Sequence, residues 1–170
     1  FVGGGTGYIT TWWDQSGYGG HAYQTSASAQ PKICTGGALY MIGGQPALYL
    51  DGSAWMQCTI AERQQPYSVG AIVQASDWSI GTNNRIYQGA SSRLWASNAF
   101  GVPVIGAGSD IFGGGLTDGA AYGMCGVYDG ASSHLRVNSA VVTGDAGTGK
   151  RDADINLFTS GSSGASGINM

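Results

Sequence analysis

Residues Ala120–Val137 read Ala-Ala-Tyr-Gly-Met-Cys-Gly-Val-Tyr-Asp-Gly-Ala-Ser-Ser-His-Leu-Arg-Val. On both sides of Asp129-Gly130, apolar residues alternate with small or polar ones, and this period of two is that of a β-strand. Asp-Gly is a preferred turn dipeptide, since Gly adopts positive φ without strain. The stretch therefore predicts two antiparallel strands joined by a tight turn.

The same alternation recurs along the chain in short runs bounded by Gly, Asn, Asp and Ser, and no stretch keeps the spacing of a helix. Strands are predicted at Tyr8–Trp13, Ala38–Ile42, Ala47–Leu50, Trp55–Ile60, Tyr67–Gln74, Arg85–Gln88, Ser92–Ala96, Val102–Gly106, Ala120–Tyr128, Ser132–Val137 and Ile155–Thr159. Turns are predicted at Asp14–Gly17, Gly43–Gly44, Asp51–Gly52, Asn83–Asn84, Asp118–Gly119 and Asp129–Gly130. Many short strands without helices between them favour antiparallel sheets, packed as a sandwich or closed as a barrel.

We expect one domain over residues 1–170, since no charge run or Pro-rich linker divides the chain. The chain begins with Phe1 and ends at Met170 after a Gly/Ser stretch. These ends are typical of a fragment or a processed piece of a longer chain.

Charge is scarce in this sequence. Charged residues make up 10% of the chain, the net charge is −3, and Lys and Arg together number seven. A surface so poor in cations cannot neutralise a phosphate backbone, so we expect no nucleic-acid partner. No apolar run approaches the roughly 20 residues that cross a bilayer, so we expect no membrane partner either.

The three cysteines, Cys34, Cys58 and Cys125, are an odd number and lack a Cys-x-x-Cys spacing. They indicate neither a disulfide framework nor a zinc site. We expect buried free thiols, because Cys is among the most often buried residue types.

One segment imitates a nucleotide-binding motif. Gly144-Asp-Ala-Gly-Thr-Gly-Lys150 has the spacing of a phosphate-binding loop, but the next residue is Arg151 instead of Ser or Thr. The following residues alternate like a strand, whereas a phosphate loop opens a helix. We therefore expect no nucleotide and no other cofactor.

Catalytic groups are also sparse. The two histidines, His21 and His134, lie in no recognisable nucleophile context or metal cluster. Glycoside hydrolysis needs a pair of carboxylates, yet Glu62 is the only glutamate and most aspartates occupy turn positions. We expect no catalytic residues and no bound metal.

Aromatic side chains give the stronger indication, and it is one of binding, because flat rings stack on sugar rings. In Thr-Trp12-Trp13-Asp the two rings must point to opposite faces of a strand, so only one of them can be core if the other face is wet. The predicted ligand-binding residues are Trp12, Trp78, Trp95, His21 and Asp77. The run Asp14, Gln15, Ser16 and Gly17 is predicted to be a structural turn that satisfies its own backbone.

Several segments resemble a known family. They are Gly7-Tyr-Ile-Thr-Thr-Trp-Trp-Asp-Gln-Ser-Gly-Tyr-Gly-Gly-His-Ala-Tyr-Gln24, Gln30-Pro-Lys-Ile33, Gly44-Gln-Pro-Ala-Leu-Tyr-Leu-Asp-Gly52, and Val127-Tyr-Asp-Gly130 with Leu135-Arg-Val-Asn138. They are similar to the laminin-G-like domains of phage and bacterial surface proteins, and to the related catalytic domain family of α-L-arabinofuranosidase B. The resemblance implies a concanavalin-like, antiparallel jelly-roll β-sandwich.

The resemblance does not carry the enzyme activity over. The nucleophilic Glu of that family would fall within Ser76–Ser97, which contains Asp77 and no Glu. The family's catalytic Asp lies in a Gly-Gly-Asp-Asn stretch, where this chain reads Thr159-Ser-Gly-Ser-Ser-Gly164. An arabinofuranosidase label is therefore expected to mislead.

Two functions are favoured over a third, a degenerate or atypical glycosidase, which activity on aryl arabinosides abolished by Asp77→Asn would indicate. The first is a non-catalytic module of a phage virion or cell-surface protein that binds host surface polysaccharide. The second is a structural virion protein, a decoration, cement or fibre domain that packs against neighbouring virion proteins, for which a homotrimer would be natural. Either function places the chain on the virion surface or outside the cell.

Overall fold

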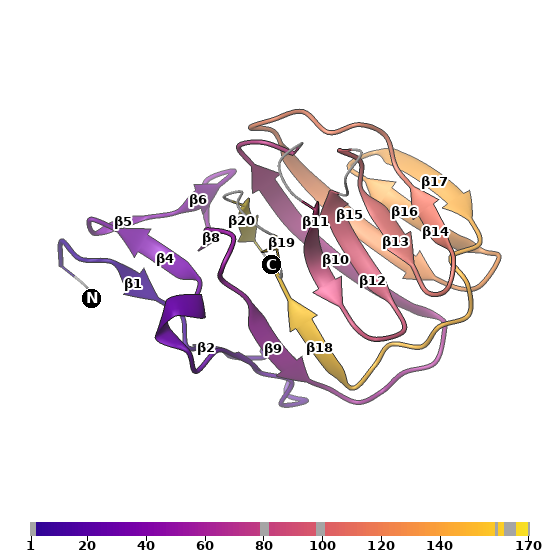
Figure 1. Ribbon diagram of the computed structural model, residues 1–170, viewed down its shortest axis with the longest axis horizontal. Coiled ribbons are helices and arrows are strands. Elements are labelled where there is room, and N and C mark those ends of the chain that lie inside the picture. The colour runs from indigo at the N-terminus through magenta and orange to yellow at the C-terminus, as the bar shows by residue number, and fades with distance from the viewer. Residues whose placement is uncertain (1–2, 79–81, 98–100, 159, 162–165, 170) are drawn as a thin grey trace.

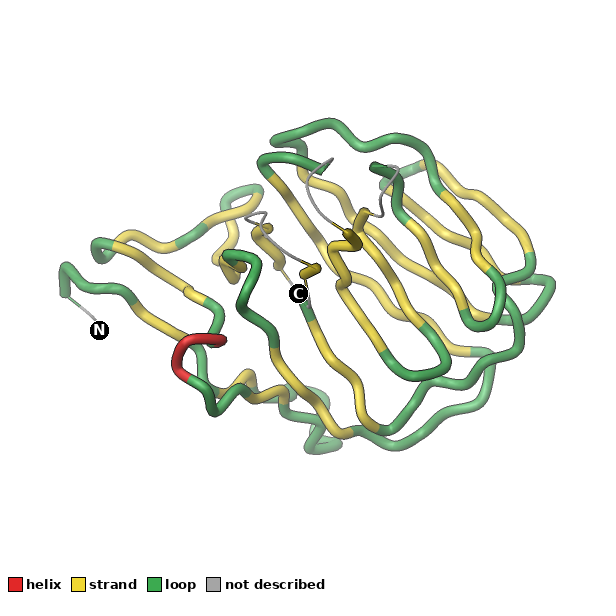
Figure 2. Tube along the Cα trace, in the orientation of Figure 1, coloured by secondary structure: helices red, strands yellow, loops and turns green. Residues whose placement is uncertain are grey.

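A computed structural model describes residues 3–78, 82–97, 101–158, 160–161 and 166–169 (Figure 1). Strands and loops account for almost all of this, and Figure 2 shows the short 3-10 turn η1 (Ala27–Ala29) as its helical element. The strand pairings that join the sheets are antiparallel. The predicted fold class, an all-β antiparallel sandwich, is confirmed, whereas jelly-roll connectivity stays a prediction.

The first large sheet, sheet A, runs across the molecule in an order that departs from the chain order. Its strands are β1 (Gly7–Tyr8), β4 (Lys32–Thr35), β8 (Leu48–Leu50), β20 (Ser166–Asn169), β10 (Tyr67–Ala75), β15 (Ala121–Tyr128), β16 (Ser133–Val137) and β17 (Ala140–Gly144), with β5 (Ala38–Leu39) beside β4.

The second large sheet, sheet B, has the order β14 (Asp110–Phe112), β13 (Val104–Gly106), β12 (Arg93–Ser97), β11 (Thr82–Gln88), β18 (Asp154–Leu157), β9 (Met56–Thr59), β3 (Ala22–Tyr23) and β2 (Thr11–Trp12), with β19 (Ser160–Gly161) beside β11. A small hairpin of β6 (Met41–Ile42) and β7 (Gln45–Pro46) lies apart from both sheets.

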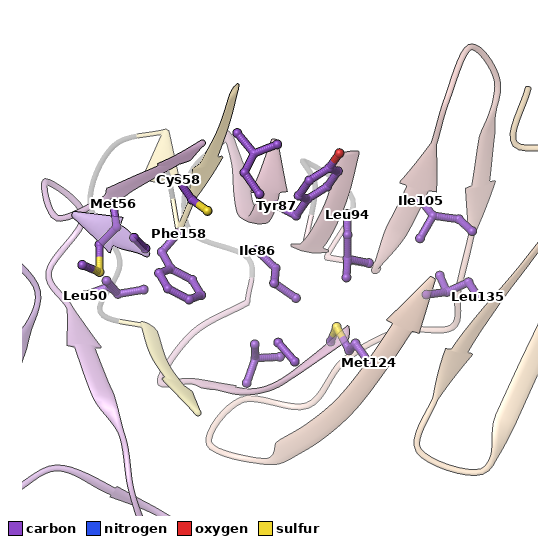
Figure 3. Close-up of a cluster of buried hydrophobic side chains, with 14 of the residues drawn as sticks. Leu50, Met56, Cys58, Ile86, Tyr87, Leu94, Ile105, Met124, Leu135 and Phe158 are labelled. Atoms are coloured by element: carbon purple, nitrogen blue, oxygen red, sulfur yellow. The ribbon is translucent and has the colours of Figure 1, made fainter. Parts of the chain in front are cut away.

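The core lies between the two sheets. Figure 3 shows Ile86 and Leu94 of sheet B facing Met124 and Leu135 of sheet A, and all four are at most 2% exposed. Burying such a side chain contributes about 1.5–3 kcal/mol, so this layer is the main source of stability. The sheets approach closely at Gly126, where an added Cβ would lie 2.5 Å from Ile105 Cγ2.

The stretch that predicts the fold class forms the expected hairpin. Strands β15 and β16 pair from Met124↔Val137 to Val127↔His134. Gly130 takes the positive φ (+51°) that the turn requires. The Ser133 hydroxyl accepts a hydrogen bond from the Asp129 amide (2.8 Å) and donates one to the Gly130 carbonyl (2.7 Å).

Three local predictions were wrong. The expected strand Ala38–Ile42 is divided between β5, which pairs with β4, and β6 of the small hairpin. The expected strand Tyr8–Trp13 is divided, so that β1 joins sheet A and β2 joins sheet B. On the side of β1 the Ile9 amide donates to the Pro31 carbonyl, and on the side of β2 the Thr10 carbonyl accepts the Gln24 amide. The expected turn at Asn83–Asn84 lies inside β11, because the ladder to β12 overrides the turn preference of Asn.

Strands without strong apolar alternation were missed. They include β3, β4, β14, β17 and β20, some of them only two or three residues long. Lys150 and Arg151 lead into strand β18, so the segment that imitates a phosphate loop opens no helix.

The late strands β18 and β20 connect early parts of the chain to its middle. In sheet A, β20 lies between β8 and β10, and in sheet B, β18 lies between β9 and β11. Figure 1 shows β9 and β18 side by side, and the pairing Asp154↔Thr59 places the end of β9 next to the start of β18.

Cys34 and Cys58 are buried free thiols, as predicted, and Cys125 is half-buried. In the part of the chain that the structure covers, no helix has the length and apolar character needed to cross a membrane.

Candidate functional site

The loop between β2 and β3 is built around the carboxylate of Asp14. Its Oδ1 accepts the Ser16 amide (2.8 Å), and its Oδ2 accepts the Ser16 hydroxyl (2.7 Å) and the Gly20 amide (3.1 Å). The Asp14 amide donates to Nδ1 of His21 (3.0 Å), which fastens the far end of the loop. Gly17 and Gly19 take positive φ, which lets the chain turn twice within this loop.

The Asp14 hydrogen bonds make its carboxyl unusually acidic. The Ser16 hydroxyl, and then the Ser16 amide, stabilise the charged form and lower the pKa of Asp14 from 3.8 to about 2. A pKa lowered by folding stabilises the loop above the unfolded value of 3.8, and this contribution is lost as the pH falls through about 2.

We therefore expect the Ser16 and Gly20 amide resonances to shift together between about pH 3 and pH 1, with a midpoint near pH 2, measured by two-dimensional NMR. An Asp14→Asn variant removes the titrating group and should show no such transition. A midpoint close to 3.8 would contradict the bonded carboxylate.

The loop rests on the end of β9. The Cys58 thiol donates to the Gly20 carbonyl (3.1 Å), and an added Cβ at Gly20 would lie 2.6 Å from Ile60 Cγ2. Gly20 therefore permits a close approach that larger residues would prevent.

Beyond β9, the chain pairs with the segment that leads into β18. Arg63 and Arg151 exchange backbone hydrogen bonds of 3.0 and 2.8 Å. The Arg151 Nη2 donates to the Ala61 carbonyl (2.6 Å), and Lys150 forms an ion pair with Glu62. These contacts fix a wall that faces the Asp14 loop.

A groove of about 680 Å³ separates the loop from this wall. We call it the Asp14 groove, and its lining consists of Asp14, Ser16, Tyr18, Gly20, Ile60, Ala61, Glu62, Arg63 and Arg151. Its size falls in the usual range for small-ligand sites, about 300–1,000 Å³.

Two exposed aromatic rings lie on the loop between β2 and β3. Tyr18, in its lining, is 94% exposed. Trp13, the residue before Asp14, is 61% exposed and packs edge-to-face against His21 at 4.6 Å between ring centroids. These rings are not part of the core, so a ligand can cover them without disturbing the packing of the protein.

The predicted site residues are distributed over the molecule. Asp14 and Ser16 of the predicted turn line the groove. Gln15, Gly17 and His21 lie in the same loop but outside the lining, and Gln15 Nε2 donates to the Trp13 carbonyl (3.0 Å). Trp12 and Trp13 do point to different environments, but Trp12 is the ring that packs on the core. The exposed ring of the pair is therefore Trp13, and ligand binding by Trp12 stays a prediction.

The prediction that Trp78 binds ligand is wrong. Its ring is 2% exposed, its Nε1 donates to the Thr117 carbonyl (3.0 Å), and it packs against Tyr122. Asp77 is half-buried and follows the end of β10. Arg63 of the groove precedes the start of that strand, so Asp77 and the groove lie toward opposite ends of β10. The backbone of Trp95 lies in β12, and its side chain lies outside the described residues.

Sequence reasoning missed Tyr18, Arg63 and Arg151. The signal for Tyr18 was its place in a Gly-rich loop, where an aromatic residue has no core to enter. The arginines give no such signal, because their pairing joins positions far apart in the chain.

A second aromatic cluster lies on the outer face of sheet A. Tyr8, Lys32 and Tyr49 are cross-strand neighbours in one row. Tyr40 stacks on Tyr49 at 4.5 Å, and the Lys32 ammonium lies 5.6 Å from the centre of the Tyr49 ring. The Tyr49 ring is thus already engaged within the protein, so this row is a weaker candidate than the groove.

Within the described ranges, no group of three His, Cys, Asp or Glu side chains is arranged to hold a metal ion.

No family model and no curated protein matches this chain. Among solved structures, it is similar to a chain described as a sialidase, with a TM-score of 0.52 and 13% sequence identity. The match covers 86% of this chain and 16% of that one, so this chain spans a small part of the sialidase. At this identity the likeness shows a shared fold alone.

Proposed function

We propose that this chain is a non-catalytic carbohydrate-binding β-sandwich module, and that the Asp14 groove is its binding site. The observation that carries the proposal is the groove itself, with the 94% exposed ring of Tyr18 in its lining and the 61% exposed ring of Trp13 on the same loop. An aromatic face covers the C–H face of a sugar, while nearby hydroxyl, carboxylate and guanidinium groups bind its hydroxyls. The laminin-G-like resemblance and the sialidase neighbour are compatible with this proposal.

The carboxylates of the groove support a binding role over hydrolysis. The low pKa of Asp14, caused first by the Ser16 hydroxyl, keeps it ionised at neutral pH, where a general acid must hold a proton. Glu62 is engaged in an ion pair with Lys150. Neither carboxyl is thus prepared as the acid of a hydrolytic pair.

The test is binding of the purified chain to an array of neutral and acidic oligosaccharides. We expect Tyr18→Ala to weaken binding about tenfold, which corresponds to roughly 1.4 kcal/mol, and Trp13→Ala to have an effect of similar size. The matched control is Tyr8→Ala, since Tyr8 is also exposed (49%) but lies in β1 of sheet A. Equal losses in Tyr8→Ala and Tyr18→Ala, or no binding by the parent chain, would refute the proposal.

One observation favours the second candidate, a structural role in a virion. At the margin of the sandwich, β14 and β17 are the outer strands of their sheets, and Phe112, Val141 and Val142 are 47%, 44% and 38% exposed. Exposed apolar edges suit packing against a neighbouring protein. A structural protein would raise the heat resistance of assembled particles, whereas a glycan binder would bind sugar as an isolated chain.

A further inference from the structure

The Asp14 groove contains an unusual pair of like charges. Arg63 and Arg151 are directly opposed in an antiparallel bridge, with both backbone hydrogen bonds formed. Residues opposed in this way carry their side chains on the same face, with Cβ atoms roughly 5 Å apart, and like charges there are destabilising. Both residues line the groove, in a chain with only seven Lys and Arg.

The carboxylates around this pair bind other groups. Glu62, the neighbour of Arg63, pairs with Lys150. Asp14 accepts hydrogen bonds from Ser16 and Gly20, and Asp152 accepts them from the amide (2.7 Å) and hydroxyl (3.0 Å) of Ser91.

The arginines therefore keep unused donors. Within the described chain, Arg63 forms no side-chain hydrogen bond or ion pair, and Arg151 uses Nη2 for the Ala61 carbonyl. Arg151 Nε is enclosed without a partner, which leaves Nη1 as the free terminal nitrogen of that side chain. A pair of guanidinium groups with open donors on one wall is an anion-binding arrangement.

From this geometry we infer that the ligand of the Asp14 groove is an acidic glycan, whose sugar carboxylate binds between Arg63 and Arg151. The inference rests on the proposed function and specifies its ligand class. A planar carboxylate accepts two parallel hydrogen bonds from a guanidinium, and its negative charge relieves the repulsion between the two arginines. The Tyr18 ring and the Ser16 hydroxyl lie in the same lining, where the rest of the sugar would contact them.

The experiment compares matched ligands by isothermal titration calorimetry. Galacturonate and glucuronate oligosaccharides are each titrated beside their methyl esters, which keep the sugar and remove the charge, and beside a sulfated oligosaccharide. We expect each acid that binds to do so at least tenfold more tightly than its ester. Raising the salt from 0.05 to 0.5 M should weaken binding of the acid and leave the ester unchanged.

Variants locate the effect. Arg63→Gln should remove the preference for acid over ester, and Arg63→Lys should restore only part of it, because an ammonium cannot form the two parallel bonds. The matched control is Arg136→Gln, which makes the same charge change on the exposed residue of β16, outside the groove, and should retain the preference.

The outcomes distinguish a failure of this inference from a failure of the proposed carbohydrate-binding function. Equal binding of acids and esters, or equal losses in the Arg63 and Arg136 variants, overturns the acidic ligand and leaves the glycan site. Preference for the sulfated ligand over the carboxylates overturns the carboxylate assignment. Failure of every sugar, neutral or acidic, overturns the proposed function as well.

Discussion

Replacing Trp78 with alanine is expected to lower the free energy of unfolding by about 3–5 kcal/mol. The ring is 2% exposed, so its removal leaves a cavity in the core. The change also deprives the Thr117 carbonyl of its indole donor and Tyr122 of an edge-to-face partner. Urea denaturation followed by far-ultraviolet circular dichroism measures this loss as a fall in the transition midpoint at constant slope.

Trp13→Ala is the matched control, since it removes the same side chain from a position that is 61% exposed. Its effect on unfolding should stay within about 1 kcal/mol, because surface substitutions change stability little. A Trp78→Ala protein as stable as the parent would contradict the buried position of the ring. A loss of ligand binding in Trp78→Ala must accordingly be interpreted as unfolding unless the denaturation curve is unchanged.

The second large effect is expected at Gln65, whose amide joins three segments of the loop region. Its Nε2 donates to the carbonyls of Gly147 (3.0 Å) and Gly149 (2.8 Å), and its Oε1 accepts the Gly130 amide (2.5 Å). Gln65→Glu keeps the shape but places a carboxylate oxygen against two carbonyl oxygens. We expect a loss of about 2–4 kcal/mol, since each carbonyl left without a donor costs about 1–3 kcal/mol.

Gln74→Glu is the control for this prediction, because Gln74 Nε2 makes one hydrogen bond, to the exposed Gly119 carbonyl (2.6 Å). Its cost should be smaller and should fall as the pH is lowered and the new carboxyl is protonated. Equal destabilisation by the two substitutions would argue against the three-segment role of Gln65. Because Gly149 lies two residues before Arg151, Gln65→Glu should also weaken ligand binding in the groove.

The strands of the fold were largely predictable from residue patterns. The alternation over Tyr67–Gln74 and Ala120–Tyr128 predicts one buried and one more exposed face, and β10 and β15 alternate in this way, although the outer face of β15 is mostly half-buried. Which sheet a strand joins was not predictable. Tyr8 and Trp12 lie four positions apart and belong to different sheets, because hydrogen bonds to distant segments decide the pairing.

The candidate site was predictable in part. Asp, Ser and Gly at turn spacing predict the loop around Asp14, and His21 lies at the end of the same loop. Alternation predicts that one of Trp12 and Trp13 faces outward. It does not predict which of the two rings faces the core, because that depends on which face the second sheet covers. The opposite wall joins Arg63 to Arg151, a contact between remote positions that no local pattern encodes.

The position of β18 and β20 inside the two sheets constrains how the chain can fold as it is synthesised. On the ribosome, β8 and β10 are made long before β20, the strand that lies between them in sheet A. In the same way, β9 and β11 are made before β18, the strand that lies between them in sheet B. Until residues 154–169 have left the exit tunnel, both half-sheets must remain open at these edges. Contacts between residues so distant in sequence slow folding, and open apolar edges attract other chains. This domain is therefore most exposed to aggregation just before residues 154–169 emerge, when nearly all of its core residues are present and neither sheet can close.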